Sequence, residues 1–132
     1  MTVKPTEKQI ERLRCFDLED SYLPTTKAVA RVLLSFIIDG NGTNTGSNPF
    51  ARAAYFRKFH DNWVGQKVKH FDQRTGIVKR VIARGKTEVR QIQRSNPVNP
   101  APFVLGVTWD NGTYSEVCVS SITKVNDVSA SL

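Results

Sequence analysis

The spacing of apolar residues changes once along this chain, near Trp63, and that change limits the possible folds more than any other feature. Before Trp63, apolar residues recur with the repeat of amphipathic helices. After Trp63, short runs alternate between apolar and polar residues, as strands with one buried face do. The sequence therefore predicts an α+β protein in which an N-terminal three-helix segment precedes a C-terminal sheet.

Capping residues mark the first two helices. Thr6 and Gln9 have the spacing of a capping box, in which each side chain accepts a hydrogen bond from the other residue's backbone N–H. The second helix is expected to begin after Thr25 or Thr26 and to end at Asp39, where turn-forming residues follow. Its apolar stripe predicts the core of the N-terminal part and consists of Val29, Val32, Leu33, Phe36 and Ile37.

The third helix is marked by Asn48, a favoured N-cap residue, and by Pro49, which suits the first helical position. We expect this helix to continue to about His60. Beyond it, strand-like runs cover residues 64–71, 76–84, 103–109, 113–119 and 123–125, and residues 86–93 form a further candidate strand.

Apolar residues also predict the register of the hairpin near residue 110. If residues 111–112 alone made the turn, Leu105 would face Cys118. If residues 110–112 form a three-residue loop, Leu105 faces Val117. We predict the second register, because it gathers the apolar side chains on one face.

The C-terminal half resembles small SH3-like barrels in four segments: Val64–His70, Thr75–Val78, Gly106–Gly112 and Val117–Val125. The nearest likeness is to KOW and Tudor-like modules, including those at the C-termini of repair helicases and in transcription-coupled regulators. The resemblance covers about half of the chain and implies a five-stranded SH3-like β-barrel. With the helices, it divides the chain into a helical segment at 1–62, a barrel at 63–125 and a flexible tail at 126–132.

The positive charge of the chain is concentrated in one stretch. There are 19 Lys and Arg against 12 Asp and Glu, a net charge of +7. Residues 67–94 hold nine cations against Asp72 and Glu88, so this stretch carries the whole excess. Cations that project from a stiff scaffold can grip phosphates without reading sequence. The predicted phosphate contacts are Lys67, Lys69, Arg74, Lys79, Arg80, Arg84, Lys86, Arg90 and Arg94.

Four aromatic residues lie near the ends of predicted strands, where aromatic rings can stack on bases. Trp109 alternates with apolar neighbours and is expected in the core, and Trp63 is expected to seal the junction between helices and barrel. Phe71 is a further stacking candidate. The predicted register turns Tyr114 outward, so we add Tyr114 to the predicted nucleic-acid-binding residues.

These features together predict a non-enzymatic nucleic-acid-binding accessory protein, with DNA and RNA both open as ligands. A larger protein complex is a possible second partner. The alternative function is a protein-interaction adaptor or inhibitor, such as one encoded by a phage or mobile element, that binds a larger enzyme complex. Two further explanations of the charge are a solvated basic face and pairing with the acidic run Asp17–Asp20 of the same chain.

No residue pattern predicts catalysis, a metal site or a cofactor. His60 precedes Asp61 and Asn62, but neighbours in sequence do not normally converge on one site, so we interpret them as the end of a helix. The segment from Asp39 begins like a calcium loop, yet it lacks the glycine and the final glutamate of such loops.

The expected location of the protein is the cytoplasm. Its two cysteines, Cys15 and Cys118, are far apart in sequence and favour a reduced chain. The longest apolar run, Val32–Ile38, is far shorter than the ~20 residues of a membrane span. We therefore expect no membrane partner.

Overall fold

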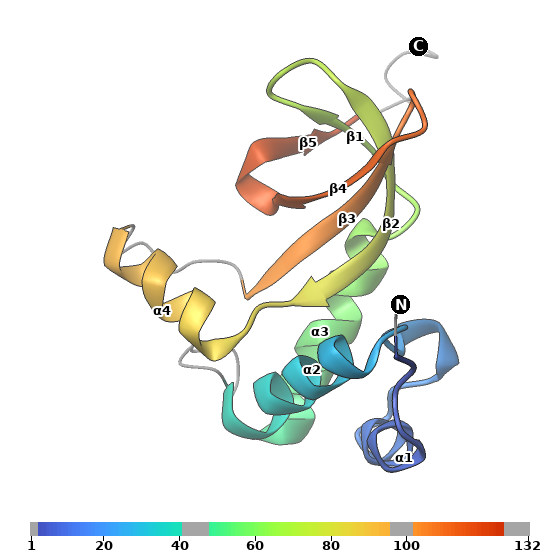
Figure 1. The fold of residues 1–132 in the computed structure, drawn as a ribbon, viewed down its shortest axis with the longest axis vertical. Coiled ribbons are helices and arrows are strands. Elements are labelled where there is room, and N and C mark those ends of the chain that lie inside the picture. The colour runs from blue at the N-terminus through green and yellow to red at the C-terminus, as the bar shows by residue number, and fades with distance from the viewer. Residues whose placement is uncertain (1–2, 41–47, 96–101, 126–132) are drawn as a thin grey trace.

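A computed structural model describes residues 3–40, 48–95 and 102–125 (Figure 1). The tail expected to be flexible, 126–132, lies outside the described residues. The protein is of the α+β class, with three of its helices before the first strand. The elements are α1 (Glu7–Cys15), the 3-10 turn η1 (Asp20–Tyr22), α2 (Lys27–Asp39), α3 (Pro49–Trp63), β1 (Lys67–His70), β2 (Thr75–Ala83), α4 (Lys86–Ser95), β3 (Phe103–Trp109), β4 (Tyr114–Cys118), the 3-10 turn η3 (Val119–Ser121) and β5 (Ile122–Lys124).

The predicted helix starts are confirmed by their caps. The capping box is complete, because Thr6 accepts from the Gln9 backbone N–H and Gln9 accepts from the Thr6 N–H. Thr26 caps α2 and Asn48 caps α3 in the same way, each through its side-chain oxygen. α3 continues to Trp63, beyond the end expected near His60. No helix in the described ranges is long and apolar enough to cross a membrane.

The five strands form one antiparallel sheet in the order β4-β3-β2-β1-β5. This sheet is open, which corrects the expectation of a closed barrel: β4 and β5 are its two edges, and no ladder joins them within the described residues. β5 has three residues and pairs with β1 instead. The helices α2 and α3 pack against β2, so helices cover apolar surface that a barrel would bury within itself.

The hairpin of β3 and β4 has the predicted register. Leu105 pairs with Val117 and Val107 pairs with Ser115. Residues 110–112 form the loop, and Gly112 adopts a φ of +89°, which L-residues with a side chain rarely take. The pairing of β2 with β3 is less regular, because a β-bulge at Lys79 interrupts it.

Residues 86–93, a candidate strand in the sequence, belong to helix α4 instead. Val89 and Ile92 are β-branched, a residue type that favours sheets. They are three residues apart, however, which places them on one side of a helix and on opposite faces of a strand. Val89 is fully buried and Ile92 is half-buried. Most of the other residues of α4 are strong helix formers.

The hydrophobic core is continuous between the helices and the sheet, and Phe103 lies at their junction. The Phe103 side chain, at the start of β3, is fully buried. It contacts one aromatic ring from α2 and three from α3, at centroid distances between 4.9 and 5.8 Å: Phe36, Tyr55, Phe56 and Phe59. We call these five residues the Phe103 cluster.

Replacing Phe103 by alanine is expected to lower the free energy of unfolding by about 3–5 kcal/mol, because it removes a buried aromatic side chain from a junction that other rings cannot refill. Phe71→Ala is the matched control. The Phe71 side chain is 75% exposed, so its removal should change stability by less than about 0.5 kcal/mol. Urea unfolding followed by circular dichroism measures both, and equal destabilisation of the two variants would contradict the assigned core.

Candidate nucleic-acid interface

Three of the predicted cations form a row on α4. Lys86, Arg90 and Arg94 are all exposed and lie four residues apart. Residues at this spacing lie one above another on a helix, about 6 Å apart along the axis. The buried Val89 turns a different side of the helix toward the rest of the chain. We call Lys86, Arg90 and Arg94 the α4 ladder.

The α4 ladder lies on a helix that stands apart from the other elements. In Figure 1, α4 extends away from the sheet and from α2 and α3. None of the ion pairs among the described residues includes Lys86, Arg90 or Arg94. A helix therefore holds three positive charges in a row, and no ion pair among the described residues neutralises them.

A second, smaller group of cations lies on β1. Lys67 and Lys69 are exposed and alternate with the buried Val68, so both project from the outer face of the sheet, opposite the core. Their register partners on β2 are Ile77 and Thr75. We call Lys67 and Lys69 the β1 lysines.

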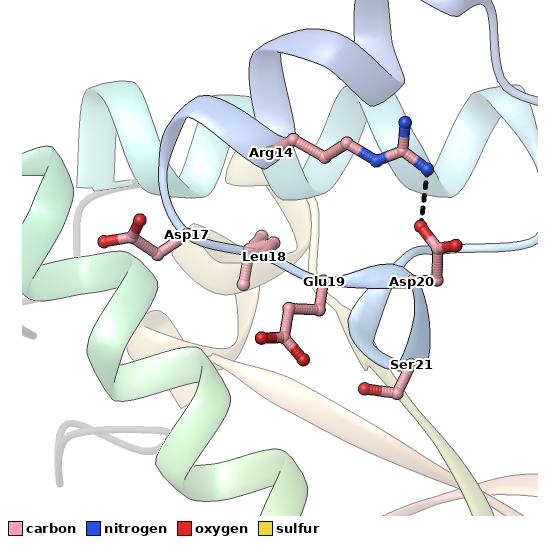
Figure 2. Close-up of a pocket in the computed structure, with 6 residues that line it drawn as sticks. All are labelled: Arg14, Asp17, Leu18, Glu19, Asp20 and Ser21. Atoms are coloured by element: carbon pink, nitrogen blue, oxygen red, sulfur yellow. Dashed lines mark hydrogen bonds and ion pairs between the residues drawn. The ribbon is translucent and has the colours of Figure 1, made fainter.

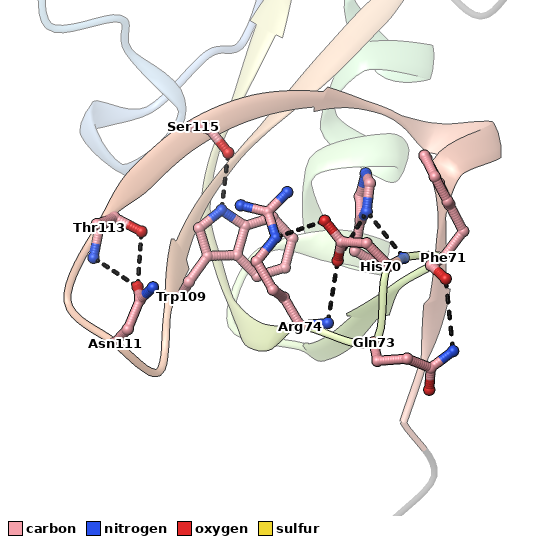
Figure 3. Close-up of polar contacts among 9 residues, drawn as sticks. His70, Phe71, Gln73, Arg74, Trp109, Asn111, Thr113 and Ser115 are labelled. Carbon is pink, nitrogen blue, oxygen red and sulfur yellow. Dashed lines mark hydrogen bonds and ion pairs between the residues drawn. The ribbon is translucent and has the colours of Figure 1, made fainter.

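Arg74, in the turn between β1 and β2, is engaged within the protein (Figure 3). Its Nε donates to Asp72 at 2.7 Å, and its guanidinium lies 4.5 Å from the centroid of the Trp109 ring. The pKa of Asp72 is lowered, first by the hydrogen bond from the Arg74 backbone N–H and then by the Arg74 side chain. Because Asp72 balances its charge, Arg74 adds little positive potential.

Lys79 and Arg80, exposed by the bulge of β2, face the N-terminal segment. Both line a cavity of about 390 Å³ that residues 20–26 also line. Arg80 donates to Thr25 Oγ1 at 3.2 Å, and its guanidinium lies 5.4 Å from the centroid of the Tyr114 ring. These contacts hold the Arg80 side chain flat against the protein surface, so it does not project into solvent.

Tyr114 is 44% exposed on the outer face, as its predicted register requires. Its ring lies over Gly106 of β3, where a Cβ would collide with the tyrosine hydroxyl and lie 2.8 Å from Arg80 Cγ. Partial burial raises the pKa of the Tyr114 phenol. One side of the ring therefore already packs on the sheet and on Arg80, which leaves less of it for a base.

Arg84 lies apart from all of these cations, because it is buried. Its side chain is 5% exposed and donates to Cys118 Sγ at 3.3 Å. Its backbone N–H donates to the Pro102 carbonyl at 2.8 Å. Arg84 thus lies where the chain leaves β2 to form α4. Because its side chain is buried there, a phosphate has no access to it.

The nine cations expected side by side are consequently separated by the fold. Three of them lie on helix α4 and not on the sheet. Lys79 and Arg80, at the bulge, face the helical half, and Arg84 is buried. The α4 ladder and the β1 lysines are exposed, in no ion pair among the described residues, and away from the cavity that Lys79 and Arg80 line.

Phe71 is more prominent on the surface than its place in the sequence indicated. It is 75% exposed, the largest exposed fraction among the large apolar side chains described, and its ring lies 4.2 Å from that of His70. The signal was present in the sequence, because strand alternation places residue 71 on the same face as Lys67 and Lys69.

One carboxylate of the acidic run, Asp20, forms an ion pair within the helical half. Figure 2 shows Asp17, Glu19 and Asp20 around a shallow pocket, with Arg14 bonded to Asp20 at 2.5 Å. The ion pairs among the described residues do not join this run to the α4 ladder. Pairing within the chain therefore does not account for the positive charge of α4.

His60 packs within α3 and does not end it, because the helix continues to Trp63. Its ring contacts Tyr22 at 4.8 Å and Phe56 at 6.0 Å between centroids. One carboxylate oxygen of the neighbouring Asp61 accepts a hydrogen bond from the Tyr22 hydroxyl at 3.0 Å, and the other lies 3.5 Å from His60 Nδ1. No group of three His, Cys, Asp or Glu side chains in the described ranges could hold a metal ion.

In comparisons with known proteins, no family model, no curated protein and no solved structure matches the chain. The likeness of the C-terminal half to SH3-like modules therefore stays an interpretation of the sequence.

The half-buried position of His60 predicts a loss of stability in acid. Desolvation lowers the pKa of His60, and the opposing effects of Asp61 are smaller. The folded state thus favours the neutral ring, whereas the unfolded chain protonates near pH ~6.5. The stability that neutral His60 contributes is complete above that pH and is lost as the pH falls through the lower pKa of the folded state.

Urea unfolding between about pH 7.5 and pH 5 is expected to show this decrease in stability, and His60→Gln should reduce the slope because glutamine does not titrate. An NMR titration of the wild-type protein measures the pKa of His60 directly. A value at or above the ordinary one, or an unchanged slope in His60→Gln, would show that burial of the ring does not control the pH dependence.

Proposed function

We propose that this protein is a non-enzymatic nucleic-acid-binding accessory protein in which the α4 ladder and the β1 lysines contact phosphates. The α4 ladder carries the proposal: its three cations are exposed, evenly spaced on a helix, and in no ion pair among the described residues. A row of this kind matches a partner whose negative charges also repeat at regular intervals.

The physical reason is the difference between a single carboxylate and a polyanion. An exposed ion pair with one carboxylate contributes at most about 1 kcal/mol. A nucleic acid carries a condensed layer of counterions, and each cation that replaces them releases ions to solution. Several modest contacts therefore add up to useful affinity without a deep pocket or a catalytic group.

We further propose that the sheet is related to SH3-like modules, although it is open. The strand order supports this relation, because β5 returns to pair with β1 and the five strands follow one another as antiparallel neighbours up to that point. Such a scaffold would hold the β1 lysines rigidly, which phosphate contacts require.

A second candidate function is binding to a protein partner as an adaptor or inhibitor, and Phe71 is the observation that favours it. An apolar ring that is 75% exposed on a turn is a typical anchor for a protein interface. Purification from the native cell separates the two functions. A partner that stays bound after nuclease treatment and is absent from Phe71→Ala supports the adaptor function, and a partner released by nuclease treatment supports nucleic-acid binding.

Neutralising the α4 ladder is expected to weaken nucleic-acid binding. Fluorescence anisotropy with labelled oligonucleotides of about 20 nucleotides, at about 50 and 200 mM salt, measures the affinity and its salt dependence. The affinity of the variant Lys86→Gln/Arg90→Gln/Arg94→Gln should fall at least about tenfold. Its slope of log affinity against log salt should become shallower by roughly 2–3, at ~0.9 for each duplex phosphate that the variant no longer neutralises.

The matched control removes the same charge from the helical half. Lys4, Lys8 and Arg12 are exposed and also lie four residues apart, and their three glutamine substitutions should change the affinity by less than about threefold. Equal weakening in the two triple variants would mean that only net charge matters, which contradicts an interface on α4. Absence of any binding at the lower salt concentration would contradict the proposed function itself.

A further inference from the structure

The dimensions of α4 restrict which nucleic acid it can meet. The helix has ten residues, so it is about 15 Å long, and it projects from the body of the protein (Figure 1). The major groove of B-form DNA, about 12 Å wide, admits an α-helix. The major groove of an A-form RNA helix is too deep and narrow for side chains to read.

We propose that α4 lies in the major groove of duplex DNA, with the α4 ladder along one phosphate backbone. This inference rests on the proposed function and adds the ligand class and the docking element. The ladder is about 12 Å long from its first to its third residue, which corresponds to roughly three to four phosphates of one strand along the duplex axis. Three cations therefore suffice to line one wall of the groove.

The surface beside the ladder fits the floor of such a groove. Thr87 is exposed and lies three residues before Arg90, so it borders the ladder on the same side of the helix. Threonine is among the side chains that hydrogen-bond to base edges in the major groove. The buried Val89 and half-buried Ile92 turn the opposite side of α4 toward the protein, so a single face is presented.

Charge complementarity selects this occupant over an acidic protein. The cations of the ladder repeat at about 6 Å along a straight helix, and the phosphates of a duplex repeat just as regularly. Glu88, the one carboxylate of α4, lies away from the ladder by helical geometry, since residues two apart do not share a face. The side of α4 that carries the ladder therefore presents cations without the carboxylate.

The test compares the full-length protein on four probes in the anisotropy assay: a DNA duplex of about 16 base pairs, an RNA duplex of the same sequence, the DNA duplex with bulky glucosyl groups on its cytosine C5 positions, and the DNA duplex with a small molecule filling its minor groove. The C5 positions face the major groove, so the glucosyl groups should reduce the affinity at least about tenfold. The minor-groove ligand should reduce it less than about threefold. The RNA duplex should bind at least about tenfold more weakly than the DNA duplex.

An exchange variant, Glu88→Arg/Arg90→Glu, tests the ladder without changing composition or net charge. It moves one cation off the ladder and puts a carboxylate in its place, so its affinity for the unmodified DNA duplex should fall at least about tenfold. The circular dichroism spectrum and the urea midpoint of this variant check that it folds. Glu7→Arg/Arg12→Glu on α1 is the corresponding exchange in the helical half and should bind as the wild type does.

The outcomes separate the two proposals. Salt-dependent binding to DNA that the glucosyl groups leave unchanged would overturn the docking in the major groove and leave the proposed function intact. Equal or tighter binding to the RNA duplex, or wild-type affinity of a folded exchange variant, would overturn it in the same way. Binding to none of the four probes would overturn both proposals.

Discussion

Burial of Phe103 is the interaction on which the arrangement of the rest depends. The ring contacts α2 and α3 from the first residue of β3, so it joins the helical layer to the sheet. Phe103 is also the register partner of Ala83, the last residue of β2. The chain therefore leaves the sheet and returns to it at one backbone pair. The excursion between them, which carries α4, is anchored where the core is most aromatic, and the Arg84 backbone hydrogen bond to Pro102 closes its base.

This anchoring explains why the charge of the protein is divided and not spread over one face. A strand at residues 86–93 would have added its cations to the outer face of the sheet. A helix outside the sheet separates them from the β1 lysines and holds Lys86, Arg90 and Arg94 one turn apart. The packing of helices on the sheet also explains why the sheet is open. α2 and α3 cover apolar surface next to β2 that a closed barrel would have buried within itself.

The remaining cations are held by neighbours that lie close only in the folded chain. Arg80 stacks on Tyr114 because Gly106, which has no side chain, leaves room for both above β3. Arg74 lies against Trp109, thirty-five positions further along the chain, while Asp72 balances its charge. An arginine held over a ring in this way has its guanidinium fixed along the protein surface. The candidate interface is therefore narrower than the basic stretch of the sequence, and α4 dominates it.

The sequence by itself determined the features that depend on a few adjacent residues: the capping box of Thr6 and Gln9, the cap at Asn48, and the hairpin register in which Leu105 faces Val117. It also carried an unused signal for α4, the three-residue spacing of Val89 and Ile92. Only the tertiary structure decided that the sheet stays open and that Arg84 is buried. The reason is that caps and turns are satisfied by hydrogen bonds within one or two turns of chain, whereas burial and charge pairing depend on residues brought together from distant positions.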